Sequence, residues 1–164
     1  MAWSASAMLG QFLFSPLCQG TTTPATGYTG LDTDTVKVSL HNNSATPDKN
    51  AAMASTGFNT GAWVTANEVI DTLNSNWPTG GNTLASGAFT SVTNGVMFDA
   101  ADLAGLGTLT ITNAFGAFVY DNTITAGTVA KQGVCFNYFG GGQSVTAGTF
   151  TIVWNASGLF QITA

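Results

Sequence analysis

The stretch that decides the fold is GVCFNYFGGG, residues 133–142. Successive side chains of a β-strand point to opposite faces, so Phe136 and Tyr138 share one face while Cys135, Asn137 and Phe139 share the other. Both faces therefore carry apolar groups. Such a strand has to lie in the middle of a sheet or be covered by another chain. The three glycines that follow predict a flexible hairpin connection.

Short apolar or alternating runs, separated by turn residues, extend outward from this strand. They predict strands over residues 36–41, 83–92, 95–98, 108–112, 115–120 and 133–139. Asn94-Gly95, Asn113-Ala114 and Asp121-Asn122 are turn signals between them. The connections are too short for helical crossovers, which indicates antiparallel pairing. We therefore expect an all-β fold, an antiparallel β-sandwich of jelly-roll or immunoglobulin-like type.

Three local patterns add detail to this expectation. In residues 36–41, Val36, Val38 and Leu40 alternate with Lys37, Ser39 and His41, which predicts a strand with one face in water. In GTFTIVWNASGLFQITA, residues 148–164, two runs flank the turn Asn155 to Gly158 and predict a C-terminal hairpin. AWVTANEVIDTL, residues 62–73, predicts at most one short helix followed by an extended segment.

The composition favours association with other uncharged surfaces. Only 7% of the 164 residues are charged, against about 25% in typical domains. Thr, Ser, Asn and Gly replace the missing charge, and such a surface costs little to dehydrate. The net charge is −5, and Lys37, Lys49 and Lys131 are scattered, so we expect no nucleic-acid partner.

The length predicts one domain, residues 31–164, preceded by an arm and linker over residues 1–30. The arm carries large apolar groups and ends in a Thr/Pro/Gly-rich link. It would either add a strand to its own sheet or reach a neighbouring chain. It lacks the basic start of a secretory signal, and polar residues interrupt its apolar run, so we expect an intact, soluble chain without a membrane partner. Cys18 and Cys135 could form one disulfide, although two buried thiols are the simpler interpretation.

The sequence contains few residues suited to catalysis. His41 is the only histidine, and we expect it at the surface without a partner. The acidic residues sit mostly where turns favour Asp, while Glu68 and Asp71 would face solvent on the short helix. DTDT (residues 32–35) and DAAD (residues 99–102) could offer oxygen ligands to calcium, but neither matches the twelve-residue calcium loop. We expect no enzyme activity, no catalytic residue, no metal and no cofactor.

Several stretches resemble small structural proteins of tailed bacteriophages, especially phages of actinobacteria. They are LDTDTVKVSLHNNSATPDKNAA, WVTANEV, WPTGG, MFDAADL, AFVYDNTI and FNYFGGGQSVTAGTFTIVWNASGLFQI, and with the opening MAWSAS they cover most of the chain. The resemblance lies in the character of these stretches and in their order along the chain, and it includes no catalytic signature. It implies a virion structural protein of the capsid decoration or cement type.

This resemblance leads to a specific expectation of function. The protein would be made in the host cytoplasm and would bind the outside of the mature phage head, where it would join major capsid subunits. It would associate with itself as a homotrimer. The residues that we expect at interfaces are Trp3, Phe12, Phe14, Phe139, Trp154 and Phe160. The alternative is a tail-fibre or tail-tip module that binds a host cell-surface glycan, with Trp63, Trp77 and Asp71 as its candidate residues.

Overall fold

Most described strands belong to one antiparallel sheet, which we call the main sheet. In this computed structural model, residues 3–13, 26–71, 76–103 and 107–163 are described. The two longest strands are β7 (Leu109–Asp121) and β8 (Gly133–Gly148), which pair with each other. β2 (Val36–His41) pairs with β7, and β1 (Ala7–Met8) pairs with β8. The short strands β3 (Glu68–Val69) and β4 (Asn82–Thr83) both pair with β2.

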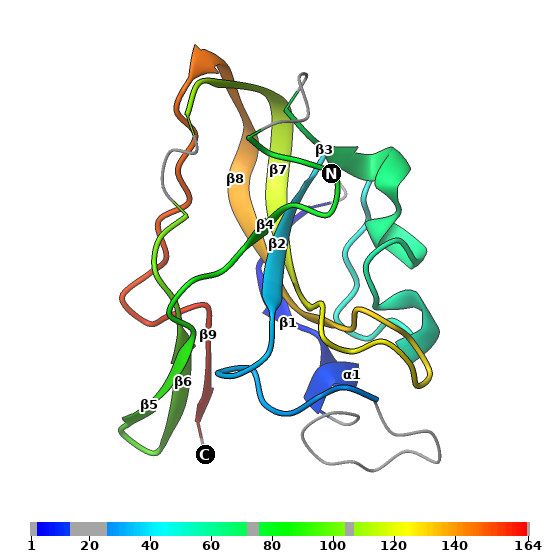
Figure 1. The fold of residues 1–164 in the computed structure, drawn as a ribbon, viewed down its shortest axis with the longest axis vertical. Coiled ribbons are helices and arrows are strands. Elements are labelled where there is room, and N and C mark those ends of the chain that lie inside the picture. The colour runs from blue at the N-terminus through cyan, green and yellow to red at the C-terminus, as the bar shows by residue number, and fades with distance from the viewer. Residues whose placement is uncertain (1–2, 14–25, 72–75, 104–106, 164) are drawn as a thin grey trace.

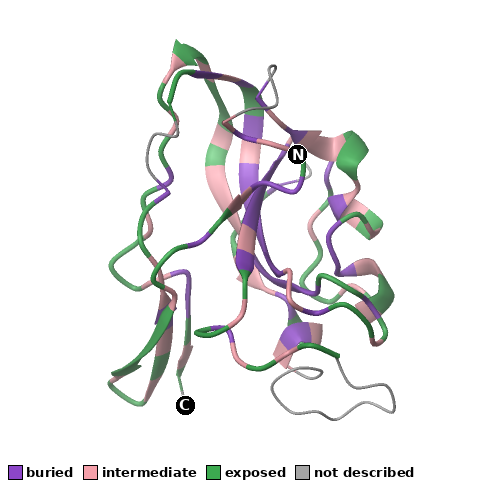
Figure 2. Cartoon of the chain, viewed as in Figure 1, coloured by how far each residue is buried: buried purple, intermediate pink, exposed green. Residues whose placement is uncertain are grey.

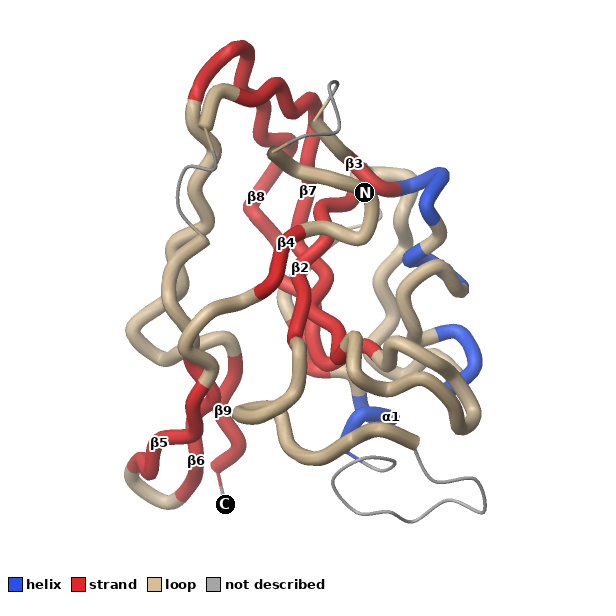
Figure 3. The backbone as a smooth tube through the Cα atoms, viewed as in Figure 1, coloured by secondary structure: helices blue, strands red, loops and turns tan. Residues whose placement is uncertain are grey.

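A smaller antiparallel sheet lies to one side. It consists of β5 (Ala88–Val92), β6 (Gly95–Asp99) and β9 (Phe160–Thr163), with β6 in the middle. Figure 1 shows this sheet on one side of the main sheet and a group of helical turns on the other. Long loops connect the two sheets (Figure 3). The prediction of an all-β, antiparallel, sandwich-like fold is confirmed.

Helical structure is confined to single turns in the described part of the chain. The one α-helix is α1 (Gly10–Phe12), and three 3-10 turns span Met53–Ser55, Gly61–Trp63 and Thr65–Asn67. The predicted short helix over residues 62–73 is therefore two 3-10 turns followed by β3. Val64 has an extended backbone, with φ −63° and ψ 148°, and this interrupts any continuous helix.

Both faces of β2 are largely buried, so the prediction that one face of this strand lies in water is wrong. Ser39 and His41 are fully buried, and Figure 2 shows burial along β2 and β7. The His41 ring lies 5.3 Å from that of Trp63 and 6.0 Å from that of Phe118. Trp63, from one of the 3-10 turns, covers this face, and the alternation within β2 does not reveal this cover.

The described part of the predicted arm folds onto its own domain. Ala7 and Met8 pair with Phe136 and Cys135 of β8, so the arm adds a strand to its own sheet. This pairing also gives β8 a neighbour on each side at Cys135 and Phe136, as the apolar groups on both its faces predict. The boundary at residue 30 stays a prediction.

Trp3 anchors the arm in the core. Its ring contacts Trp63 and Phe136, and its Nε1 donates a 3.0 Å hydrogen bond to the Asn42 carbonyl. Gly116 makes room for it, since an added Cβ there would lie 2.4 Å from a Trp3 ring carbon.

Two predicted turns lie inside long strands. Asn113-Ala114 falls within β7, where Asn113 has φ 54° and the pairing with β8 shifts register. Gly140 to Gly142 fall within β8 and do not form a hairpin connection. Left-handed residues can be accommodated as bulges inside a strand, and a sequence pattern does not distinguish a bulge from a turn. The predicted strand over residues 83–92, by contrast, is broken between β4 and β5, where Ser86 has φ 57°.

The predicted C-terminal hairpin is also wrong in its pairing. β9 pairs with β6, whereas Ile152 forms only an isolated bridge with Leu103. The turn itself is present, because the Gly158 N–H donates a 2.8 Å hydrogen bond to the Asn155 carbonyl. The alternation is present as well, with Ile152 buried and Val153 70% exposed. The two runs therefore go to different partners.

We predict unequal stability losses for two tryptophans. Trp3→Ala removes a fully buried ring and should lower the free energy of unfolding by about 3–5 kcal/mol. Trp154→Ala removes a half-buried ring and one hydrogen bond to the Ala101 carbonyl, and should cost only about 1 kcal/mol. Urea unfolding followed by circular dichroism measures both. Equal losses would contradict the core role of Trp3.

Candidate functional site

A serine and the single histidine form a buried pair. The Ser39 side-chain oxygen lies 3.0 Å from Nε2 of His41, and both residues are fully buried. Burial lowers the pKa of His41 to about 3, and its Nδ1 has no hydrogen-bond partner. A hydrolytic pair needs an accessible serine and a histidine that can accept a proton. The pair is therefore part of the core. The prediction of a surface His41 without a partner is wrong.

Glu68 fixes a turn beside the main sheet. Its Oε1 accepts a 2.7 Å hydrogen bond from the Gly80 N–H, and the Tyr120 hydroxyl donates a 2.7 Å bond to the Gly80 carbonyl. Burial raises the pKa of Glu68 to about 7. Gly81 has φ +65°, and a Cβ there would lie 1.7 Å from the Val38 carbonyl oxygen, so this turn requires glycine. The contacts of Glu68 are structural.

The three residues predicted for glycan binding are buried. Trp63, Trp77 and Asp71 expose 2%, 0% and 1% of their surface. Asp71 accepts backbone N–H bonds from Thr110 at 3.0 Å and Asn76 at 3.4 Å. These residues have no ring face or carboxylate to offer a sugar in this structure. The prediction that Glu68 and Asp71 lie on a solvated helix face is wrong for the same reason.

The residues predicted at interfaces lie in different environments. Trp3 and Phe12 are fully buried, and Phe160 is 9% exposed. Phe139 and Trp154 are half-buried, and Phe14 lies outside the described residues, as does Cys18. An interface role for these residues stays a prediction, although Trp3 and Phe12 expose no surface to a partner. Cys135 is buried, and burial raises the pKa of its thiol to about 12.

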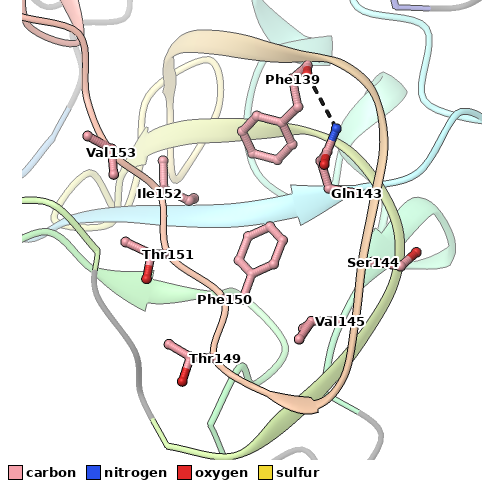
Figure 4. Close-up of a pocket in the computed structure, with 9 residues that line it drawn as sticks. All are labelled: Phe139, Gln143, Ser144, Val145, Thr149, Phe150, Thr151, Ile152 and Val153. Carbon is pink, nitrogen blue, oxygen red and sulfur yellow. Dashed lines mark hydrogen bonds between the residues drawn. The ribbon is translucent and has the colours of Figure 1, made fainter.

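A well-formed surface hollow lies between the C-terminal part of β8 and the segment of residues 149–153 (Figure 4). It measures about 420 Å³, and the side chains of Phe139, Gln143 and Phe150 point into it. The two phenylalanine rings lie 6.3 Å apart, and Phe150 also contacts Trp77 at 6.0 Å. None of the nine lining side chains is charged. The hollow therefore suits a neutral ligand or an uncharged protein surface.

A second candidate lies on the smaller sheet and is an apolar patch. Phe89, Val96 and Ile162 share one face, because Phe89 pairs with Phe98, Ser91 with Val96, and Val96 with Ile162. Phe89 and Val96 are each 40% exposed, and Ile162 is half-buried. We call these three residues the tip patch.

The tip patch adjoins a free strand edge. β5 pairs only with β6 among the described strands, it contains no charged residue, and four of its five residues are exposed (Figure 2). Exposed strand edges without charge or proline pair readily with another chain. Sequence reasoning did not identify this surface. The sequence signal that could have identified this surface is the alternation of apolar with other residues before and after Thr93-Asn94.

The described residues hold no recognisable metal or membrane element. No group of three or more His, Cys, Asp or Glu side chains among them is arranged to bind a metal ion. None of the helices described is long and apolar enough to cross a membrane. The hollow and the tip patch are therefore the surfaces on which a function can be argued.

The pH dependence of stability should reveal the buried histidine. Between pH 3 and pH 6.5, His41 binds a proton in the unfolded chain but not in the folded chain. The contribution of His41 to the free energy of unfolding therefore falls as the pH falls. The slope approaches about 1.4 kcal/mol per pH unit. Glu68 and Asp121, whose pKa values burial raises to about 7, contribute in the opposite direction.

His41→Leu isolates the histidine contribution. The difference in unfolding free energy between wild type and variant should grow as the pH rises from 4 to 6.5 and should be constant above it. Urea unfolding at four pH values measures this difference. A difference that does not change with pH would mean that His41 has the same pKa in the folded and the unfolded chain.

Comparison with protein-family models, with curated proteins and with solved structures found no match. The resemblance to phage virion proteins therefore stays a prediction from the sequence. Function has to be argued from the described surfaces of this chain.

Proposed function

We propose that this protein is a structural protein of a tailed-phage virion, a capsid decoration protein on the outside of the mature head. In this role it contacts the major capsid protein and copies of itself, and it carries out no reaction. The observation that carries the proposal is the tip patch beside the uncharged free edge of β5. An apolar face next to an unpaired strand is suited to a protein partner.

The surface chemistry supports the same proposal. Charged residues make up only 7% of the chain, and β5 and β9 contain none. A surface of Thr, Ser, Asn and small apolar groups loses little hydration energy when it is covered. A partner held by charge would instead need clustered side chains of one sign. The tip patch therefore favours a neutral partner surface.

The proposed mechanism is passive. Decoration proteins of this kind would add contacts between neighbouring capsid subunits and so resist the pressure of packaged DNA. If the binding surface forms only in the expanded shell, the protein stabilises that state because it binds that state better. Association into a trimer would add avidity without stronger individual contacts.

The hollow favours a second candidate, a tail module that binds a glycan. Its two aromatic rings, the Gln143 amide and the hydroxyl groups of neighbouring Ser and Thr residues are groups that can contact a neutral sugar. This candidate would use Phe139 and Phe150 in place of Trp63, Trp77 and Asp71, which are buried.

The number of copies per particle distinguishes the two candidates. A decoration protein should be present in numbers comparable with the major capsid protein of the same purified virions. Quantitative mass spectrometry with the capsid protein as internal reference measures this ratio. A handful of copies would contradict decoration and favour the tail module. Complete absence from virions would overturn both.

A charge on the tip patch should weaken capsid binding. We expect Val96→Glu to reduce co-sedimentation with capsids at least about 10-fold, since a carboxylate would be buried without a partner. Ala66→Glu is the control, because it places the same charge on an exposed apolar residue outside both the patch and the hollow. Equal binding by both variants would exclude the tip patch as the contact surface.

A further inference from the structure

The strand β5 forms the outer edge of the smaller sheet. Among the described strands it pairs only with β6, and Figure 1 shows it on the side of this sheet that faces away from the main sheet. The opposite edge strand, β9, lies toward the main sheet, because Phe160 and Gln161 line a hollow together with Ala7 and Met8 of β1. β5 is therefore the edge of the smaller sheet that is open to a partner.

The pairing within this sheet fixes where the backbone groups of β5 point. In an antiparallel sheet the N–H and C=O of one residue point to one neighbouring strand, and those of the next residue point to the other side. The Phe98 carbonyl accepts a 2.9 Å hydrogen bond from the Leu159 N–H, so it points toward β9. Phe89, which lies opposite Phe98, accordingly directs its N–H and C=O away from β6. Ser91, two residues further along β5, does the same.

The open edge lacks the features that usually keep a strand edge from pairing. Natural edge strands carry charged side chains, proline or a bulge that prevents association with another chain. β5 contains no charged residue and no proline, and its register with β6 is regular over Ala88–Val92. Residues 88–91 are all exposed. The edge thus presents a regular row of donors and acceptors to solvent.

We propose that β5 pairs with β5 of a second copy of this chain, in antiparallel direction around a two-fold axis at Thr90. This register places Phe89 of each copy opposite Ser91 of the other. Each of these two residue pairs exchanges two hydrogen bonds, so every outward N–H and C=O of both residues is satisfied. A register shifted by one residue would place outward groups opposite groups that point to β6.

The distribution of charge favours a second copy at this edge. Each copy carries a net charge of −5, so two copies repel each other wherever their acidic residues meet. In the proposed pairing only the uncharged residues of β5 lie opposite each other. Asp99, opposite Ala88, lies on β6. The two β6 strands would be three strand spacings apart, about 14 Å, which exceeds the Debye length of about 8 Å at physiological salt.

The pairing also covers apolar surface. Phe89 is 40% exposed, although its ring lies 5.1 Å from that of Phe98. In the paired sheet the two Phe89 side chains are diagonal neighbours on one face, which is within reach of aromatic rings. Both tip patches lie on this face of a continuous sheet with three strands from each copy. The dimer would present a doubled tip patch to the capsid, and only this last point rests on the proposed function.

Sedimentation equilibrium of the full chain without capsids tests the pairing. Between about 1 µM and about 1 mM, we expect the mass to rise from that of one 16.8 kDa chain to that of two. A two-fold pairing of one edge closes at two copies, so a trimer would use another surface. A monomer at every concentration, or a trimer, would overturn the proposal. Neither result would alter the number of copies per virion, on which the proposed function is tested.

A proline at Ser91 should weaken the dimer. Ser91→Pro removes an outward N–H that the pairing with β6 does not use, and by symmetry it removes this donor from both copies. We expect dimerisation at least about 10-fold weaker. Ser91→Ala is the matched control, because it removes the hydroxyl and keeps the N–H. If a folded Ser91→Pro, checked by circular dichroism, dimerises as well as Ser91→Ala, the edge is not the interface.

Cysteine cross-linking tests the register directly, even if Ser91→Pro does not fold. The two Thr90 residues would lie opposite each other in a non-hydrogen-bonded pair, with Cα atoms about 4.5 Å apart, so Thr90→Cys should give a disulfide-linked dimer on oxidation. Ala88→Cys is the matched control, because Ala88 is also exposed and would lie opposite Val92, four residues from its own copy. Both variants keep Cys18 and Cys135. Equal yields of covalent dimer on a non-reducing gel, or none from Thr90→Cys, would overturn the proposed pairing.

Discussion

The stack of Trp63 on Phe118 is the contact on which the main sheet depends. The two rings are 4.1 Å apart and nearly parallel, at 9°. Phe118 lies in β7, which pairs with β2 and β8 and is buried on both faces. An aromatic cover on the second face removes a large apolar area from water. The burial of His41, the bond between Ser39 and His41, and the close approach of Trp3 to Gly116 all accompany this cover.

Three of the few charged residues of this chain are used inside it. Asp71 and Asp121 are buried, and Glu68 is half-buried and bonds to a turn. Each of them satisfies backbone N–H groups that would otherwise be unpaired. The outer surface is consequently poorer in charge than the composition alone implies. Neutral surfaces of this kind dehydrate readily, which links the internal electrostatics to the proposed association with other proteins.

The sequence predicts the fold class and the central place of the strand around Phe136, because alternation and turn residues are local signals. It does not predict strand lengths, since Asn113 and Gly140 are compatible with a turn or with a bulge inside a strand. The partner of β9 and the aromatic cover over His41 are long-range features that no window of sequence contains. The candidate surfaces are missed for the same reason, because Val96 and Phe89 become a patch only when β5, β6 and β9 are assembled.

The docking of the N-terminal arm has a consequence for the order in which the chain folds. The Tyr138 N–H donates a 2.8 Å bond to the Ser6 hydroxyl across 132 residues of sequence, and Ala7 pairs with Phe136. Trp3 therefore has no binding site until β8 has left the ribosome. Contacts of such sequence separation slow folding, and until they form the apolar arm is exposed to chaperones and proteases. Residues 3–8 are synthesised long before the strand that they contact, and are thus among the last to reach their native positions.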